Sequence, residues 1–180
     1  MPTRKIRITG PESAGKTTLT QALARHFACP WVPEYARTYL TALDRPYVQK
    51  DLDEIWLGQR QAEQELSVQY PDAPYLFCDT GPEVLYIWSK VKYGEVSPLL
   101  TNAQRHPYDF TLLCAPDLPW EADPLREAPA ASTRWALFAQ YQGLLDEQNV
   151  AYQIIRGERE TRFLLALSNI NLKAKSLMKK

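Results

Sequence analysis

The sequence lacks an excess of charge of either sign and lacks any long hydrophobic run. Lys plus Arg number 21 and Asp plus Glu number 21, so the formal net charge at pH 7 is +0. A chain without a net positive field is not expected to bind nucleic acid or an anionic membrane surface. No apolar stretch approaches the roughly 18 residues that a membrane-spanning helix needs, and the first residues do not form a signal-peptide pattern. These absences predict a cytoplasmic protein that does not bind a membrane.

Cysteine is scarce, and its spacing does not match that of a metal site. The three cysteines are Cys29, Cys78 and Cys114. Cys78 and Cys114 lie in apolar, strand-like runs, where a thiol behaves as a small buried hydrophobic group. We therefore expect reduced thiols rather than disulfides. Repeats and low-complexity segments are also absent, and a length of 180 residues predicts one domain spanning 1–180.

The N-terminal region, in contrast, contains a phosphate-binding motif. Residues 10–17, GPESAGKT, fit the pattern G-x-x-x-x-G-K-[ST], with a β-prone run before them and a helical pattern after them. In such a loop the backbone N–H groups and the helix N-terminus bind phosphate together. Lys16 is expected to reach the β- and γ-phosphates of ATP, and the Thr17 hydroxyl to ligate Mg²⁺. The predicted ATP-binding residues of this loop are Gly10, Glu12, Ser13, Ala14, Gly15, Lys16, Thr17 and Thr18.

Strand and helix signals alternate along the rest of the chain. Within this pattern, Asp51 and Glu54 are expected to form a capping box, and Ser132 to cap a later helix. Short apolar strands separated by helices favour a parallel sheet that is covered on both faces. The expected strands lie near residues 6–8, 30–33, 75–79, 110–114 and 152–155, and the expected helices at 17–27, 51–69, 82–94, 132–148 and from 159 onward.

Missing motifs separate this chain from other classes of nucleotide-binding protein. No N/T-K-x-D guanine-recognition motif is present, and the segment 79–82 lacks the glycine of a GTPase D-x-x-G switch. The additional helical subdomain of an oligomeric ATPase has little room in 180 residues. A small-molecule kinase fits better, since it needs a phosphate loop, a carboxylate, an acceptor pocket and a lid that carries arginines.

Candidates for these kinase parts lie at suitable positions. Asp79 ends a strand at the carboxyl edge of the expected sheet, beside the phosphate loop, and Glu34 follows the second strand at the same edge. Residues 116–134 include a proline-rich stretch without periodicity, which is the expected mobile lid. Arg126 and Arg134 flank that stretch and are the candidate phosphate-binding arginines of the lid.

Four segments then carry a resemblance to a known family. They read GPESAGKTTL, VPEYARTYL, LFCDTGPEVLYIWSKVKYG and LLCAPDLPWEADPLRE. Together, from Ile6 to about Arg162, they resemble the nicotinamide riboside kinase domain of NadR-type bacterial regulators of NAD salvage. The resemblance implies an α/β P-loop kinase fold, a three-layer sandwich with a five-stranded parallel sheet in the order 2-3-1-4-5. It also implies transfer of the γ-phosphoryl group of ATP to the ribose 5′-hydroxyl of nicotinamide riboside, which gives the mononucleotide.

Roles can be assigned to single residues on this basis. The expected catalytic residues are Lys16, Glu34, Asp79 and Arg126, and the expected Mg²⁺ ligands are Thr17 and Asp79. A planar nicotinamide with a positive charge favours an aromatic face, for which Trp120 is the main candidate. The predicted substrate-binding residues are Glu34, Arg37, Asp79, Thr80, Trp88, Tyr93, Trp120 and Asp123, and the predicted cofactors are ATP and Mg²⁺.

Two departures from the family pattern keep alternatives open. Gly81 stands where the family often has an acidic residue, and Pro124 stands where the lid often has glycine. A kinase for another nucleoside or small phosphate acceptor is therefore an alternative, and a regulatory ATP-binding module is a second one. No H-x-G-H adenylyltransferase signature is present, so the reaction is expected to stop at the mononucleotide. The sequence does not assign an oligomeric state.

Overall fold

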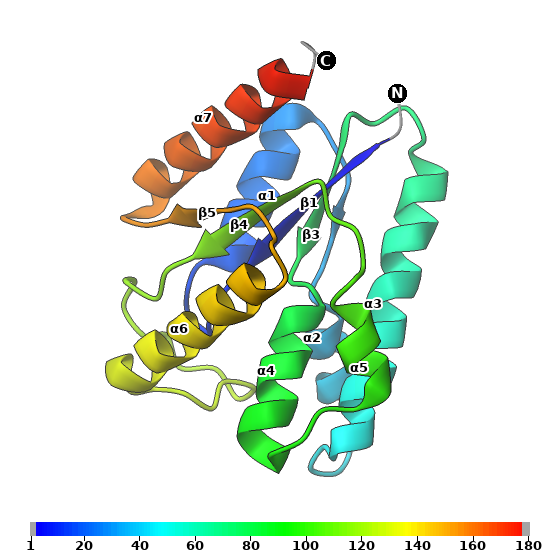
Figure 1. Ribbon diagram of the computed structural model, residues 1–180, viewed down its shortest axis with the longest axis vertical. Helices are drawn as coiled ribbons and strands as arrows, with labels where there is room; N and C mark the ends of the chain where they lie inside the picture. Colours follow the sequence, from blue (N-terminus) through cyan, green and yellow to red (C-terminus); the bar gives the residue numbers. More distant parts are fainter. Residues whose placement is uncertain (1–2, 178–180) are drawn as a thin grey trace.

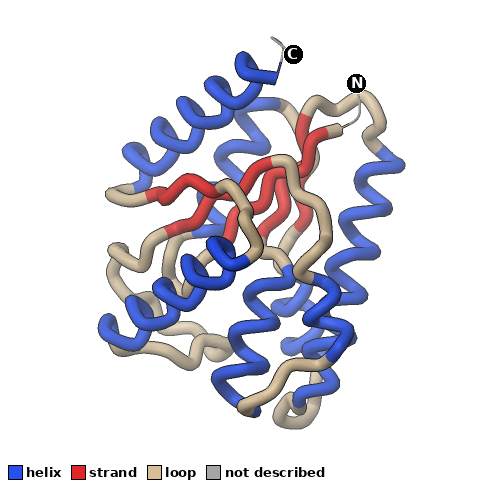
Figure 2. The backbone as a smooth tube through the Cα atoms, viewed as in Figure 1, coloured by secondary structure: helices blue, strands red, loops and turns tan. Residues whose placement is uncertain are grey.

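The short apolar runs form the strands of one parallel sheet. The computed structural model describes residues 3–177, and Figure 2 shows the strands at the centre of the molecule. The sheet has the order β2-β3-β1-β4-β5, and every neighbouring pair is parallel. This confirms the predicted α/β class and the strand order 2-3-1-4-5. The strands are β1 (Arg4–Thr9), β2 (Trp31–Val32), β3 (Tyr75–Asp79), β4 (Phe110–Cys114) and β5 (Tyr152–Ile155).

Helices cover both faces of the sheet (Figure 1). On one face α1 (Lys16–Phe27) and α7 (Arg159–Leu177) lie side by side over a core that includes Ile8 and Phe77. On the other face lie α3 (Gln49–Gln69), α4 (Pro82–Tyr93) and α6 (Ala131–Glu147). Each strand contributes side chains to both cores, because successive side chains of a strand point to opposite faces of the sheet. The remaining helices, α2 (Tyr35–Ala42) and α5 (Pro98–Ala103), pack beside α3.

A glycine in the middle of α3 lets α2 approach closely. A Cβ atom on Gly58 would lie 2.1 Å from Cε1 of Tyr35, which is far inside contact distance. The Tyr35 N–H also donates to Oε1 of Gln59 at 2.8 Å. Because Tyr35 begins α2, these contacts hold the preceding residue, Glu34, at the carboxyl edge of the sheet.

Two predicted helix caps are wrong. Helix α3 begins at Gln49, and Asp51 is its third residue, where the carboxylate accepts the Val48 N–H at 2.7 Å. Asp51 is therefore the third helical residue of a capping box whose N-cap is Val48. It is not the N-cap of a box that includes Glu54. Helix α6 begins one residue before Ser132, after an Ala130 that makes no side-chain cap bond. Local sequence patterns locate helix ends only to within a residue or two, because neighbouring polar residues compete for the same orphan N–H groups.

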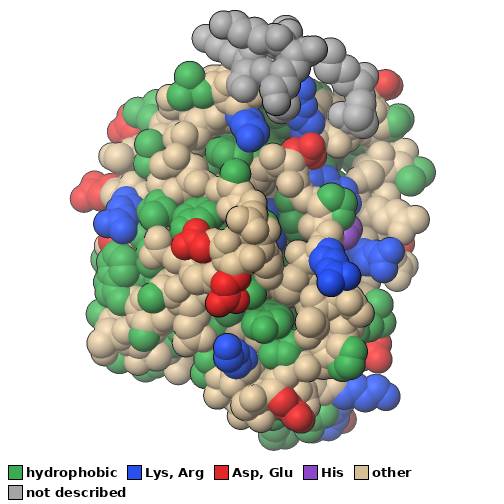
Figure 3. Space-filling model, in the orientation of Figure 1, with side chains coloured by type: hydrophobic (Ala, Val, Ile, Leu, Met, Phe, Trp, Pro, Cys, Tyr) green, Lys and Arg blue, Asp and Glu red, His purple; other side chains and the backbone are tan. Residues whose placement is uncertain are grey.

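The structure also gives the surroundings of the thiols and the distribution of charge on one face of the surface. Cys29, Cys78 and Cys114 are all buried free thiols, and the burial of Cys78 and Cys114 is as their apolar runs predicted. The face in Figure 3 carries positive and negative side chains interspersed with apolar ones. Within residues 3–177 no helix is long and apolar enough to cross a membrane, and no group of three or more His, Cys, Asp or Glu residues could hold a metal ion.

Candidate active site

The phosphate-binding motif adopts an open loop between β1 and α1. Three residues of the loop have positive φ angles, at 135° for Gly10, 52° for Ser13 and 71° for Gly15. A Cβ atom on Gly10 would lie 2.4 Å from the carbonyl oxygen of Cys114, so only glycine fits where the loop passes β4. Gly15 caps α1 without a side-chain bond, which leaves the first N–H groups of the helix available to a bound anion.

Lys16, Thr17 and Asp79 meet at the carboxyl edge of the sheet. Asp79 ends β3 and pairs in register with Ile8 of β1, the strand that leads into the loop. The Thr17 hydroxyl donates to Oδ2 of Asp79 at 2.6 Å, and Lys16 Nζ donates to the Pro11 carbonyl oxygen at 2.9 Å. The structure thus brings together the three residues that the sequence analysis linked to phosphate and Mg²⁺.

The environment of Asp79 is unusual for a carboxylate. Its side chain is 1% exposed, and burial, with the nearby charge of Glu34, raises its pKa to about 6. The Thr17 hydroxyl, Lys16 and Arg37 act in the opposite direction and limit the rise in pKa. Oδ1 of Asp79 is buried and has no hydrogen-bond partner among the residues that the structure describes. An ionised carboxylate in such a place needs a further positive partner.

Thr17 and Asp79 together fit a Mg²⁺ ion. Mg²⁺ takes oxygen ligands and is commonly held by one or two protein groups, with phosphate oxygens and water completing its shell. The unpartnered Oδ1 of Asp79 and the Thr17 hydroxyl supply such oxygens next to the phosphate loop. A bound ion would also supply the positive partner that buried Asp79 lacks. Its chemistry there would be neutralisation of phosphate charge.

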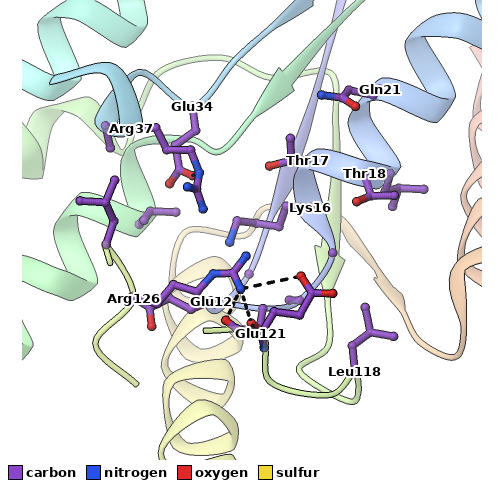
Figure 4. A pocket seen from close by; sticks show the side chains of 18 of the residues that line it. Glu12, Lys16, Thr17, Thr18, Gln21, Glu34, Arg37, Leu118, Glu121 and Arg126 are labelled. Carbon is purple, nitrogen blue, oxygen red and sulfur yellow. Dashed lines mark hydrogen bonds and ion pairs between the residues drawn. The ribbon is translucent and has the colours of Figure 1, made fainter. Parts of the chain in front are cut away.

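The expected lid lies over the phosphate loop. Residues 115–130 connect β4 to α6 without helix or strand. The Glu12 carboxylate accepts the N–H groups of Glu127 and Ala128, at 3.0 Å and 2.9 Å. The Ser13 hydroxyl accepts from Nη1 of Arg126 at 2.8 Å and from the Glu121 N–H at 3.2 Å. Figure 4 shows Lys16, Arg37 and Arg126 extending from α1, α2 and the lid into one common space.

The second lid arginine and Trp120 form a separate arrangement. Arg134 is buried and donates to the Leu118 carbonyl oxygen at 3.2 Å, inside the lid itself. The Trp120 ring centre lies 5.9 Å from the Arg126 guanidinium carbon and 5.6 Å from that of Arg134. Trp120 is not among the described residues that line the cavity, and its ring lies against the two arginines.

A cavity of about 640 Å³ extends from the phosphate loop to α2, α3 and α4. Glu34 and Arg37 line it, and the Nε of Arg37 lies 3.7 Å from a Glu34 carboxylate oxygen. Nη1 of Arg37 also donates to Oδ2 of Asp123 at 2.8 Å, which ties α2 to the lid. The deeper wall is apolar and aromatic, from Leu40, Leu52, Ile55, Val84, Leu85, Trp88 and Tyr141.

Among the aromatic and hydroxyl residues predicted to bind the substrate, some line the cavity and others lie outside its lining. Trp88 lines the cavity, whereas Tyr93 packs in the cluster between α2 and α5, with its hydroxyl donating to the Tyr47 carbonyl oxygen at 3.1 Å. Thr80 is buried at φ 79°, and its N–H donates to the Ile8 carbonyl oxygen at 2.9 Å. Of the residues predicted to bind the acceptor, Glu34, Arg37 and Trp88 therefore line the cavity. Tyr93 packs with residues of its wall, and Thr80 is held against β1.

Other residues of the site gave no signal in the sequence. Tyr141 of α6 is 1% exposed and lines the cavity, but an aromatic residue inside a helix looks like ordinary core. Arg162 of α7 is buried and donates to the carbonyl oxygens of Ala14 and Ala115, each at 2.9 Å. It also pairs with Asp117. Arg162 thus joins the phosphate loop to the start of the lid, and only tertiary structure reveals this role.

The departure at Gly81 has a physical cause. A Cβ atom on Gly81 would lie 2.4 Å from Cδ of Arg7 and 2.6 Å from Oε2 of Glu83. Arg7 and Glu83 form a buried ion pair with 2.6 Å between Nη1 and Oε2. The space next to the Asp79–Gly81 turn is thus filled by this pair, so an acidic side chain at position 81 would collide with it.

The fold and the site define a P-loop nucleotide-binding domain. Comparison with known families matches residues 5–162 to the AAA domain family, and the chain belongs to that family. The Trifunctional NAD biosynthesis/regulator protein NadR of Salmonella typhimurium strain LT2 is 29% identical over 167 residues, which cover 89% of this chain and 40% of that protein. The protein of the same name from Escherichia coli K12 gives the same values. The chain thus spans about 40% of the length of the curated relatives that it matches.

Solved structures show the same fold at lower identity. The NadR protein in complex with NR has a TM-score of 0.82 and 22% identity, over 95% of this chain and 51% of that chain. Thymidylate kinase from Ehrlichia chaffeensis has a TM-score of 0.65 and 12% identity, over 96% and 99%. Deoxyadenosine kinase from M. mycoides with products bound has a TM-score of 0.58 and 15% identity, over 93% and 98%. The fold is that of P-loop kinases, as the sequence predicted.

Proposed function

We propose that this domain is an ATP-dependent kinase that phosphorylates the ribose 5′-hydroxyl of nicotinamide riboside. The observation that carries the proposal is that the cavity of about 640 Å³ continues from the phosphate loop to α2, α3 and α4, where Glu34 and Arg37 line it. The part beside α1 and α7 would take the nucleotide, and a protein that only senses ATP needs no space beyond that part. The resemblance of the phosphate loop, the 34–37 segment, the 79–82 turn and the lid to the NadR-type kinase domain supports the choice of acceptor.

Each residue then has a role in positioning and charge neutralisation. Lys16 binds the β- and γ-phosphates, and Thr17 and Asp79 hold Mg²⁺. Arg126 lies over the loop, where it would neutralise the transferred phosphoryl group, while Arg134 supports the lid from within. Phosphoryl transfer passes through a loose transition state, so alignment of the acceptor hydroxyl by Glu34 and Asp79 matters more than a strong base.

The acceptor end of the cavity suits a flat cationic ring joined to a ribose. Trp88 offers an aromatic face and the leucines of α2, α3 and α4 offer apolar contact, with Glu34 as the nearby negative charge. The proposal assigns this role first to Trp88 because it lines the cavity, with Trp120 of the lid as the second candidate. The lid is proposed to span about 116–134, within one kinase domain, 1–180. The buried unpaired cysteines support a cytoplasmic location.

The test is ADP release with ATP and Mg²⁺ across a panel of nucleosides, with Lys16→Ala as the blank. Acceptor-dependent release at least about tenfold faster with nicotinamide riboside than with other nucleosides supports the proposal. Equal rates with uridine, cytidine or deoxynucleosides would identify the domain as a nucleoside kinase of broader specificity. The thymidylate and deoxyadenosine kinases that share the fold make this the alternative function. ATP binding without acceptor-dependent turnover would refute a kinase and leave a regulatory ATP-binding module.

A further inference from the structure

Glu12 is a carboxylate inside a loop that binds phosphate. A negative side chain gains nothing from the phosphates of ATP, so its presence in the loop calls for another partner. In the structure that partner is the lid, through the N–H groups of Glu127 and Ala128 at 3.0 Å and 2.9 Å. Burial raises the pKa of Glu12, and these two hydrogen bonds and the charge of Lys16 counteract the rise. The side chain of Glu12 therefore binds the lid, while the backbone N–H groups of the loop are left for phosphate.

The two N–H groups directly follow Arg126 in the chain. Arg126 itself contacts the next residue of the phosphate loop, with Nη1 donating to the Ser13 hydroxyl at 2.8 Å. Glu12 and Ser13 thus hold the backbone after Arg126 and the tip of its side chain. Farther out, the Glu127 carboxylate accepts from the Tyr47 hydroxyl at 2.8 Å, which joins the same lid segment to the acceptor side of the cavity.

We propose that Glu12 is a positioning residue that docks the lid on the phosphate loop and thereby places Arg126 over the transferred phosphoryl group. The inference rests on the proposed kinase function, because it assigns to Arg126 a charge to neutralise. It explains why a loop built to attract anions contains an acidic side chain. Glu12 accepts hydrogen bonds from backbone N–H groups of the lid. The side chains at positions 127 and 128 can therefore vary without loss of this contact.

The alternative hypothesis is that the Glu12 carboxylate competes with ATP for the lid. In that case the N–H groups of Glu127 and Ala128 are a phosphate-binding site, and Glu12 occupies this site in the absence of ATP. The two readings predict opposite effects of Glu12→Ala. Loss of a docking residue leaves ATP affinity nearly unchanged and slows turnover, whereas loss of a competitor tightens ATP binding.

Glu12→Ala, Glu12→Gln and the exposed Glu54→Gln, as a matched control for charge, form the test set. The first readout is trypsin cleavage after Arg126, followed by mass spectrometry in the presence of ATP and Mg²⁺ without acceptor. We expect cleavage in Glu12→Ala to be about 10-fold faster than in the parent, with Glu12→Gln between them because an amide oxygen still accepts an N–H. Unchanged cleavage in Glu12→Ala would overturn the proposal.

The second readout separates turnover from binding. With the acceptor that the nucleoside panel identifies, Glu12→Ala should lower kcat about 10- to 100-fold and change the Kd of ATP less than about threefold, with partial rescue by Glu12→Gln. Tighter ATP binding in Glu12→Ala would overturn the docking role in favour of competition. Because cleavage needs no acceptor, a failure of the kinase assignment leaves the lid result interpretable by itself.

Discussion

Replacing Asp79 with Asn should change how the stability of the metal-free protein depends on pH. Asp79 is 1% exposed, and its burial, together with Glu34, raises its pKa from 3.8 to about 6. A carboxylate whose pKa is higher in the folded state destabilises the fold once it is ionised. This cost is absent below the unfolded pKa, grows as pH rises between the two pKa values and is complete above the folded one. Asn carries no charge and is free of the cost at every pH.

The size of the effect follows from the two pKa values of Asp79. Integration of proton binding gives a cost of about 1 kcal/mol near pH 4.5 and about 3 kcal/mol near pH 8. The difference in free energy of unfolding between Asp79→Asn and the parent should therefore move by about 2 kcal/mol in favour of the variant over this range. A changed hydrogen bond with Thr17 adds an offset that does not depend on the ionisation of Asp79.

Urea unfolding near these two pH values, without nucleotide or Mg²⁺, measures the shift. The exposed Asp72→Asn variant controls for the loss of one negative charge. An offset between Asp79→Asn and the parent that is the same at both pH values would refute the argument from burial. In the presence of Mg²⁺ and ATP, Asp79→Asn should lose acceptor-dependent turnover even though its fold is more stable near pH 8.

Three further predictions concern the stability of the fold. Gly58→Ala should destabilise the protein by about 1 to 2 kcal/mol in urea unfolding, because the new Cβ meets the Tyr35 ring and overrides the helix preference of Ala. Gly143→Ala in α6, where no described atom lies within 4 Å of a new Cβ, should instead stabilise by up to about 1 kcal/mol. Glu83→Gln should cost about 3 kcal/mol by the same assay, since it leaves the Arg7 guanidinium buried without its anion. A cost below about 1 kcal/mol would show that the Arg7–Glu83 pair is not needed for stability.

Much of the fold and the phosphate end of the site could be predicted because their signals are local. The strand β1, the loop 10–15 and the start of α1 are contiguous, so spacing alone placed Lys16 and Thr17. Asp79 was found by the rule that parallel strands end at one edge of a sheet. The same local reasoning failed at Asp51, whose carboxylate reaches backward to Val48.

The acceptor end could not be predicted to the same depth. The sequence favours Trp120 as the aromatic contact, with Trp88 and Tyr93 as further candidates. Only the packing of α4 shows that Trp88 lines the cavity. The excluded side chain at Gly81 depends on Arg7 and Glu83, which are 76 positions apart in the chain. Such contacts have no sequence spacing from which they could be inferred.

The sequence by itself determined that this chain is a P-loop domain with a parallel sheet, because a phosphate loop is built from neighbouring residues and strand alternation follows a short period. Tertiary structure alone decided what Glu12 does, since its partner at Ala128 lies 116 positions away and is a backbone N–H that no residue type marks. It also decided that Asp79 is buried with an oxygen left unpartnered among the described residues. Burial depends on every element that packs around a residue, and so the chemistry of this carboxylate emerges only when the chain is folded.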